Sequence, residues 1–345
     1  MSNIKKNIVI GKKAPSSLIA EKIEVKLNDA RIAEKSAEYF TAAFLYRDIL
    51  KLSLKKNDSK IIKLCKKKVV EMNKKSIAYD KCWNKFPIEL KLSKDEEIFV
   101  KKILKQKNLK TILQIIGNIP CFSPDADKIK RSSIPVSFQI TDLSNISQGG
   151  HILRGGADSD KAWFMTIYNL EQQRITHLFI GRIIYELMKK TSDKNKQLTI
   201  EELSEYFSNA NIFEEKNLKL ILIGLKRYFE NDYVSAMHIL VPQFESTFLR
   251  ISEKCGIDII ALDQKQGIAT RTKTLSETYL DSEEFKNVWG NNLCQQIKFI
   301  LFDQMGYRIR HKVAHGEIEY DECNFSNTTI IIYLYLVLLG RVHKK

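Results

Sequence analysis

The residues best suited to chemistry lie near the C-terminus, in the segment 308–316. It reads RIRHKVAHG and brings two imidazoles and two guanidinium groups into nine residues. Histidine exchanges protons near neutral pH, and arginine binds phosphate or carboxylate oxygens through paired N–H groups. The apolar run 330–339 follows closely. We expect that run to be a buried helix that gives the polar segment a rigid support.

Metal binding and a purely structural role are two interpretations of this segment. His311 and His315 are four residues apart and can share one face of a helix, as metal ligands often do. The H-E-x-x-H metal motif, however, has Glu where this sequence has Lys312, whose charge opposes a cation. We therefore expect no metal and no cofactor. In the structural interpretation the imidazoles pack or cap, and the arginines form a solvated face.

RNA cleavage is the third interpretation. A base removes the proton of a ribose 2′-hydroxyl, which attacks the neighbouring phosphate, and an acid protonates the leaving 5′-oxygen. A guanidinium stabilises the negative charge that develops on phosphorus, and no metal is required. Arg310 and His315 are five residues apart, about 140° around an α-helix, so they do not share one narrow face. A second copy of the motif, across a symmetric dimer, can complete the geometry.

A second informative stretch lies upstream. Its apolar residues recur at intervals of three and four, which predicts an amphipathic helix with one core seam; they are Val234, Met237, Val241, Phe244, Phe248 and Ile251. Pro242 lies inside this pattern and predicts a kink. His238 and Glu245 lie off the seam and are seven residues apart, within about 20° of each other on a helix. By spacing alone they are exposed polar groups or polar groups that support a neighbouring site.

The motif resembles a known family. Residues 310–315, RHKVAH, match the R-x4-6-H pattern of the HEPN superfamily (higher eukaryotes and prokaryotes nucleotide-binding). With Gly316 they resemble the R-N-x-x-x-H-G signature of an uncharacterised domain family, which also occurs in the endoplasmic-reticulum membrane-associated RNA degradation protein. His311 stands where the narrower signature has Asn, although the superfamily accepts His there. Residues 228–238, 241–245 and 249–250 resemble the upstream helix of the same family, and the resemblance covers roughly residues 212–345.

The resemblance implies a helical bundle that dimerises, with two motifs facing one metal-independent endoribonuclease site. In that arrangement His315 is the general acid and base, and Arg310 binds the scissile phosphate. His311 is a secondary polar contact, and Glu245 and His238 orient the motif. Many such proteins are toxins or antiviral-defence effectors, so RNA, a second copy, and an antitoxin or defence-system partner are the expected partners. The alternative is a non-catalytic HEPN module that binds nucleotides or RNA, or that supports protein assembly.

The rest of the chain predicts an all-α protein with at most one small β-hairpin. Helical spacing covers 18–54, 60–86 and 109–116, and a Ser93 capping box opens another helix. Residues 118–160 are rich in Pro and Gly, and a strand at 136–140 is expected to pair with 152–153. We therefore expect a basic helical domain at 1–120, a connector at 121–160, linking helices at 161–211 and the HEPN-like domain at 212–345.

Charge and composition narrow the class of protein. Residues 1–110 hold 28 Lys and Arg against 13 Asp and Glu, whereas residues 111–345 hold 28 of each. This basic excess is either a polyanion-binding face or a set of lysines on solvated helix faces, and only Arg31 and Arg47 in it are arginines. The N-terminus lacks the apolar run of a signal peptide. No apolar run approaches the ~20 residues of a membrane span. The six cysteines form no C-x-x-C pair, which suits a reducing cytoplasm. We expect a soluble, cytoplasmic protein without a membrane partner.

Overall fold

A computed structural model describes residues 15–79, 91–118, 122–132, 145–146, 152–154, 159–189, 196–263 and 269–342. The chain divides into two compact units. The smaller unit comprises residues 1–87 and 142–157, and the larger one comprises residues 88–141 and 158–345. The strand expected at 136–140 and the end of the helix expected at 60–86 lie outside the described residues.

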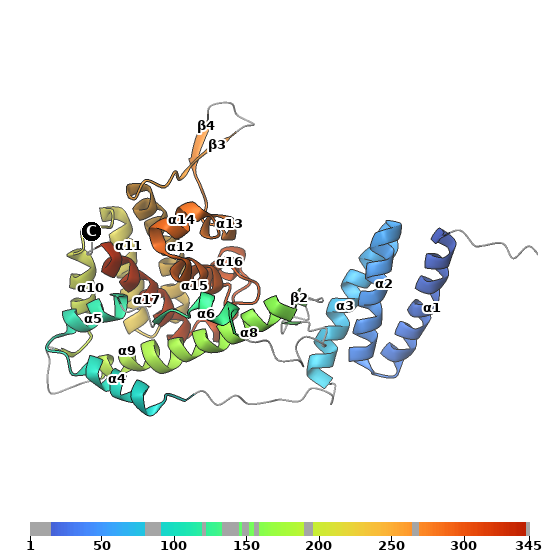
Figure 1. Cartoon of the computed structure of the whole chain (residues 1–345), viewed down its shortest axis with the longest axis horizontal. Coiled ribbons are helices and arrows are strands. Elements are labelled where there is room, and N and C mark those ends of the chain that lie inside the picture. Colours follow the sequence, from blue (N-terminus) through green and yellow to red (C-terminus); the bar gives the residue numbers. More distant parts are fainter. Residues whose placement is uncertain are drawn as a thin grey trace, which may run out of the picture. The chain divides into compact units, whose positions relative to one another are not determined.

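The smaller unit is an array of three helices, α1 (Pro15–Lys35), α2 (Tyr39–Lys56) and α3 (Ser59–Tyr79), in which α2 packs against both neighbours (Figure 1). The helical pattern of residues 18–54 forms two helices, because the chain turns at Ala37, whose φ is 59°. Ala30 and Ala42 are fully buried between the helices. Phe40 and Phe44, which the spacing places on the same seam, are 49% and 46% exposed because the turn changes the helix phase.

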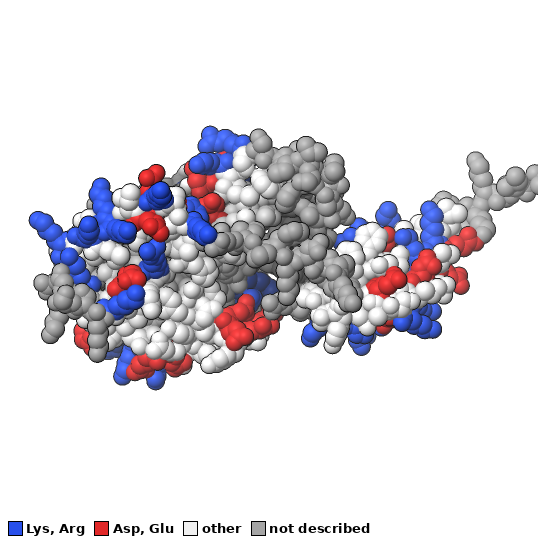
Figure 2. Space-filling model, turned by 90° about the horizontal axis from the view of Figure 1, so that it is seen from below, with Lys and Arg blue, Asp and Glu red and all other residues white. Residues whose placement is uncertain are grey.

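Basic side chains of the smaller unit are interspersed with acidic ones on the face seen in Figure 2. One acidic group links the helices: Glu34 accepts hydrogen bonds from Tyr46 Oη at 3.0 Å and from Lys68 Nζ at 2.5 Å. Mixed charges of this kind are typical of solvated helix faces. This unit also contains a short antiparallel pair, β1 (Asn145–Ile146) and β2 (Ile152–Arg154). Strand β2 thus pairs with β1, which is closer in sequence than the strand expected at 136–140.

Within its described residues the larger unit is helical apart from one hairpin, which confirms the all-α fold class. Its elements within the described residues are α4 (Lys94–Leu104), α5 (Leu109–Asn118), α6 (Ala126–Lys130), α8 (Ser159–Gln173), the π-helix η2 (Arg174–Gly181), α9 (Arg182–Met188), α10 (Ile200–Ser208), α11 (Glu215–Phe229), α12 (Tyr233–Lys254), β3 (Ile260–Asp263), β4 (Ala269–Thr272), α13 (Glu277–Leu280), α14 (Glu283–Trp289), α15 (Asn291–Leu301), α16 (Ile309–His315), the 3-10 turn η4 (Tyr320–Glu322) and α17 (Phe325–Val342). The β3–β4 hairpin is a correction: together with β1–β2 it gives the described residues two antiparallel pairs, whereas the sequence predicted at most one small β-hairpin.

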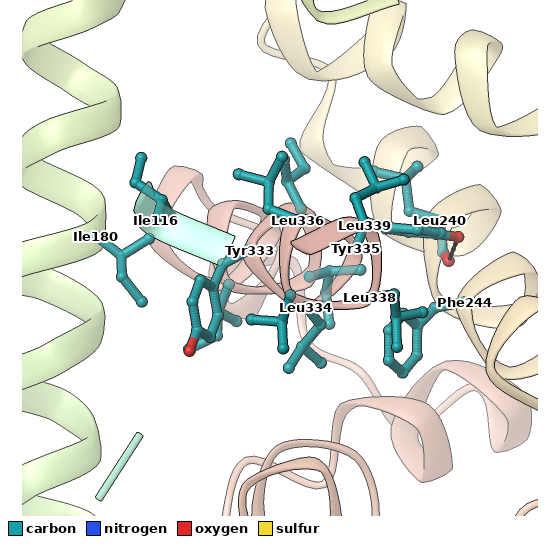
Figure 3. Close-up of a cluster of buried hydrophobic side chains, with 14 of the residues drawn as sticks. Ile116, Ile180, Leu240, Phe244, Tyr333, Leu334, Tyr335, Leu336, Leu338 and Leu339 are labelled. Carbon is teal, nitrogen blue, oxygen red and sulfur yellow. Dashed lines mark hydrogen bonds between the residues drawn. The ribbon is translucent and has the colours of Figure 1, made fainter. Parts of the chain in front are cut away.

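Helix α17 is the centre of the larger unit. Residues 330–339 are each 5% exposed or less, which confirms the expected buried helix. Figure 3 shows Ile116 of α5 and Ile180 of η2 on one side of α17, and Leu240 and Phe244 of α12 on the other. The two tyrosines in the run donate hydrogen bonds from their hydroxyls to backbone carbonyls at 2.9 Å: Tyr333 to Phe122 and Tyr335 to Leu240. Burial therefore leaves these polar groups satisfied.

The domain boundary differs from the expected one near residue 120. Helices α4 and α5 belong to the larger unit, and Val100, Ile112 and Ile116 are part of its core. The apolar faces of α4 and α5 are long enough to predict that both segments are helices. These faces do not indicate which other helix covers them, so the unit to which they belong could not be predicted.

The predicted capping box at Ser93 is confirmed, because Ser93 accepts from the amide of Glu96 and Glu96 accepts from the amide of Ser93. Thr199 and Ser282 also cap helices, each accepting a hydrogen bond from the backbone amide three residues later. None of the helices in the described parts of the chain has the length and apolar character needed to cross a membrane.

Helices α5 and α17 cross at two glycines. A Cβ added to Gly117 would lie 2.2 Å from the carbonyl oxygen of Leu336, and one added to Gly340 would lie 2.8 Å from the backbone of Gly117. The backbones approach so closely that no side chain fits between them. This crossing fixes one end of the central helix against α5.

We predict that Gly340→Ala destabilises the protein by about 1–3 kcal/mol, because the added methyl group overpacks the crossing. The sign of this stability change is informative, since Gly→Ala inside a helix normally stabilises a protein by about 0.5–1 kcal/mol. Urea unfolding measures the change. Lys216→Ala on the exposed face of α11 is the control, expected within about 0.5 kcal/mol of the parent protein. A Gly340→Ala protein as stable as the parent would show that the crossing is looser than described.

Candidate functional site

The motif lies on the short helix α16, which is fixed at both ends. It begins at Arg308 in the left-handed region, with φ of 56°, and ends at Gly316, with φ of 65°. Ile309 is 2% exposed and packs into the core of the larger unit. Immediately before the helix, the amide of Tyr307 donates to the carbonyl of Phe299 on α15 at 3.1 Å. The motif is therefore presented by a packed element and not by a free loop.

Arg310 is held by Glu245 of α12. Its Nε donates to Glu245 Oε2 at 2.9 Å, and the two side chains are 24% and 14% exposed. The guanidinium carbon also lies 5.9 Å from the ring centre of Phe302. The bond engages Nε alone, and the two terminal nitrogens of Arg310 form no hydrogen bond with any described residue. Arg310 is thus oriented while its outer N–H groups stay available to a ligand.

Glu245 has a second hydrogen bond. Its other oxygen, Oε1, accepts from the backbone amide of Leu275 at 3.0 Å. Leu275 is buried and follows the β3–β4 hairpin directly. One carboxylate therefore joins three parts of the chain that are far apart in sequence: helix α12, the end of the hairpin and the motif helix α16. The sequence singled out Glu245 as a possible orienter, and the structure brings it against Arg310.

The two imidazoles of the motif lie against each other. The ring centres of His311 and His315 are 4.3 Å apart and the ring planes make an angle of 46°. His315 is exposed and His311 is partly buried. His311 Nε2 lies 3.8 Å from Glu317 Oε2, and Arg308 Nη1 donates to the same oxygen at 3.2 Å. Arg308 is thus paired with an acid of the following turn.

The pKa of His311 is lowered from its ordinary value of 6.5. Burial is the largest cause, followed by the positive charges of Arg308 and of a protonated His315, while Glu317 opposes the shift. A neutral imidazole thus remains next to His315 over more of the acidic range.

His238 is not brought into contact with the motif. It is exposed on α12, and its Nδ1 donates to the carbonyl of Val234 at 2.8 Å. Among the described residues no hydrogen bond or ion pair connects His238 to Arg310 or His315. Val234, at the start of the predicted seam, is 37% exposed, whereas Met237 and the later seam residues are buried.

Several contacts of the site carried no signal in the sequence. Phe302, Glu317 and the Leu275 amide were not candidates, and neither was Glu322, which pairs with Lys312. Each depends on where the chain returns in space. In the described parts of the chain, no three His, Cys, Asp or Glu side chains lie close enough together to hold a metal ion.

Comparison with known proteins gives no match: no family model, no curated protein and no solved structure matches the chain.

We predict that Glu245→Ala destabilises the protein by about 1–3 kcal/mol, because it leaves the partly buried guanidinium of Arg310 and the Leu275 amide without their acceptor. Thermal unfolding measures the loss. Glu317→Ala, which removes a carboxylate that is 49% exposed, is the control and is expected to change stability far less. Equal losses for the two variants would contradict the bridging role of Glu245.

A histidine titration by NMR tests the environment of His311. We predict a midpoint below 6.5, and a partial rise in Arg308→Gln, since burial remains as the larger cause. Because the unfolded chain binds this proton more readily, His311 lowers stability as the pH falls through about 6.5, until the folded pKa is reached. His311→Asn removes that part of the pH dependence. A midpoint at or above 6.5 would rule out the described surroundings.

Proposed function

We propose that this protein is a metal-independent endoribonuclease whose site contains Arg310 and His315. The observation that carries the proposal is the hydrogen bond from Arg310 Nε to Glu245, which orients the guanidinium yet leaves its terminal nitrogens unbonded, on a helix that also carries two histidines in ring contact. A positioned phosphate-binding group together with imidazoles as acid and base is what transesterification of RNA requires. The resemblance of residues 212–345 to the HEPN superfamily supports the same proposal.

The proposed reaction proceeds by attack of the 2′-hydroxyl. His315 accepts the proton of that hydroxyl, the bond from O2′ to phosphorus forms, and the bond from phosphorus to O5′ breaks. A protonated imidazole then gives its proton to the leaving O5′. The products are a 2′,3′-cyclic phosphate and a 5′-hydroxyl end. The terminal N–H groups of Arg310 bind the phosphate oxygens as their charge grows.

A second copy of the chain is part of this proposal. Arg310 is turned towards α12, where Glu245 holds it, whereas His315 is exposed at the other end of the same helix. The two groups lie about 140° apart around α16, so one copy of the helix does not direct both of them at one phosphate. In a symmetric dimer, Arg310 of one copy and the partner subunit's His315 can face one scissile bond. The solution mass of the protein tests this part directly.

A non-catalytic module that binds RNA or nucleotides is the second candidate function. The same ion pair favours it, because Glu245 offsets the positive charge of Arg310 and so weakens its field at a phosphate. In this alternative α16 binds RNA without breaking it, and the affinity falls steeply with salt. In either case we propose RNA as the ligand and the cytoplasm as the compartment. A role as toxin or antiviral-defence effector, restrained by an antitoxin or defence-system partner, belongs to the catalytic proposal.

The test is incubation of full-length protein with mixed RNA in EDTA, followed by end-group analysis. We predict cleavage that leaves 2′,3′-cyclic phosphate, reduced about 10²–10⁴-fold in His315→Ala through loss of acid–base catalysis. Arg310→Gln is expected to lose about 10²–10³-fold through loss of charge stabilisation.

His177→Ala is the matched control, since His177 is an exposed histidine of η2 whose ring bonds Ser326 Oγ at 3.1 Å and which has no hydrogen bond or ion pair with the motif among the described residues. We expect it to cleave as the parent does. RNA binding without cleavage in every variant would support the non-catalytic candidate. Cleavage that survives His315→Ala, or that requires a divalent metal, would contradict the catalytic proposal.

A further inference from the structure

Two cations of the motif segment, Arg308 and Lys312, are paired with carboxylates that follow the motif helix in sequence. Arg308 Nη1 donates to Glu317 Oε2 at 3.2 Å, and Lys312 Nζ donates to Glu322 Oε1. The four side chains are between 22% and 49% exposed, so both pairs remain accessible to solvent. The proposed reaction gives neither pair a role.

The two acids belong to one short segment, residues 317–322, which we call the acidic turn. It reads EIEYDE, so four of its six residues carry carboxylates. Gly316 ends α16 in the left-handed region, and Glu317 follows it directly. The Glu317 carboxylate nevertheless reaches Arg308 at the opposite end of the helix, and it lies 3.8 Å from His311 Nε2. The acidic turn thus places a carboxylate along the side of the motif helix.

The acidic turn is held in place by its own hydrogen bonds. The second oxygen of Glu322, Oε2, accepts from the backbone amide of Glu319 at 3.1 Å. The carbonyl of Glu322 accepts from Asn327 Nδ2 at 2.8 Å, and Asn327 lies in the first turn of the buried helix α17. Glu322 therefore connects the motif helix, the turn and α17. The carboxylates are positioned against the motif and do not belong to a free loop.

Carboxylates and phosphates are bound by the same cationic donors. Arg308 and Lys312 each lie two residues from Arg310 in sequence, so they are suited to RNA phosphates next to the scissile one. In the structure these donors are already occupied by carboxylates. Ion pairs of this exposure contribute little to stability, so another anion can replace the carboxylate. RNA supplies several phosphates at once and gains further from counterion release.

We infer that the acidic turn is an intramolecular competitor of RNA. Glu317 occupies Arg308 and Glu322 occupies Lys312 in the free protein, and RNA phosphates replace both carboxylates when the substrate binds. This inference rests on the proposed function, because it takes RNA as the ligand of the motif. It adds two phosphate contacts to the proposed site and a built-in restraint on the affinity of that site.

Binding of a fluorescent single-stranded RNA to the full-length protein tests this inference. The RNA carries a 2′-O-methyl group on every ribose, which blocks attack by the 2′-hydroxyl, and anisotropy is measured in EDTA over a range of salt concentrations. We expect Glu317→Gln and Glu322→Gln each to bind about fivefold more tightly, because each frees one cation from an exposed pair. Each variant should also have a log–log salt slope steeper by about 0.7, the contribution of one additional phosphate contact to a single strand.

Asp321→Asn is the matched control. It removes one negative charge from the same turn, and the Asp321 carboxylate has no hydrogen bond or ion pair with the motif among the described residues. We expect its affinity to change by less than about twofold, because salt screens an exposed charge, and its salt slope to stay that of the parent. A general effect of net charge would instead give all three variants the same gain.

A double variant tests whether the released cation is the one that binds RNA. Combining Glu317→Gln with Arg308→Gln is expected to remove the gain in affinity, because the group that Glu317 releases is then missing. Combining Glu317→Gln with Lys216→Gln removes a cation from the 77% exposed side chain of Lys216 on α11 and should keep the gain.

Two results would overturn the inference alone. One is equal affinity and salt slope in Glu317→Gln, Glu322→Gln and Asp321→Asn, and the other is a gain that persists in the Arg308→Gln double variant. Both leave RNA binding and cleavage by the parent unaffected. Absence of RNA binding by every variant would overturn the inference together with the proposed function. Thermal unfolding checks that the variants are folded, and Glu317→Gln carries the test by itself if Glu322→Gln loosens the turn.

Discussion

Burial of α17 on all sides is the constraint on which the larger unit depends. A helix whose ten central residues are each at most 5% exposed cannot lie at a surface, so other helices must surround it. Helix α12 covers one side, and α5 and η2 cover another, with Gly117 and Gly340 allowing the closest approach. Since α12 carries Glu245, the burial of α17 also fixes the carboxylate that orients Arg310. Core packing and the geometry of the motif are thus parts of one arrangement.

Glu245 links the packing of the larger unit to the chemistry of the motif. A carboxylate that accepts from a guanidinium and from the Leu275 amide loses most of its freedom, and so does its arginine. Orientation of this kind raises the affinity of Arg310 for a phosphate ligand, because the side chain loses fewer conformations on binding. The same pairing reduces the net charge presented to the phosphate. The proposed activity depends on which effect is larger, and the two imidazoles carried by the same helix as Arg310 favour catalysis.

Much of this fold can be predicted from local patterns. The apolar run 330–339, the seam from Met237 to Ile251 and the caps at Ser93, Thr199 and Ser282 are signals that neighbouring residues carry by themselves. Glu245 could be singled out because helical spacing placed it off the seam and because residues 241–245 resemble the upstream helix of a known family. Its bond to Leu275, the pairing of Lys312 with Glu322 and the assignment of α4 and α5 to the larger unit could not be predicted. Each depends on which distant segment covers a given face, and periodicity within a segment does not contain that information.

The central claim is that a ribose 2′-hydroxyl is the nucleophile at a site containing Arg310 and His315. The most direct measurement is single-turnover cleavage, in EDTA, of an RNA oligonucleotide with one mapped scissile position, compared with the same oligonucleotide carrying a single 2′-deoxy residue there. Attack by the 2′-hydroxyl predicts that the substituted position is not cleaved while other positions are unaffected. Cleavage of the substituted position at the parent rate would mean that water or another group is the nucleophile, and would contradict the proposed mechanism.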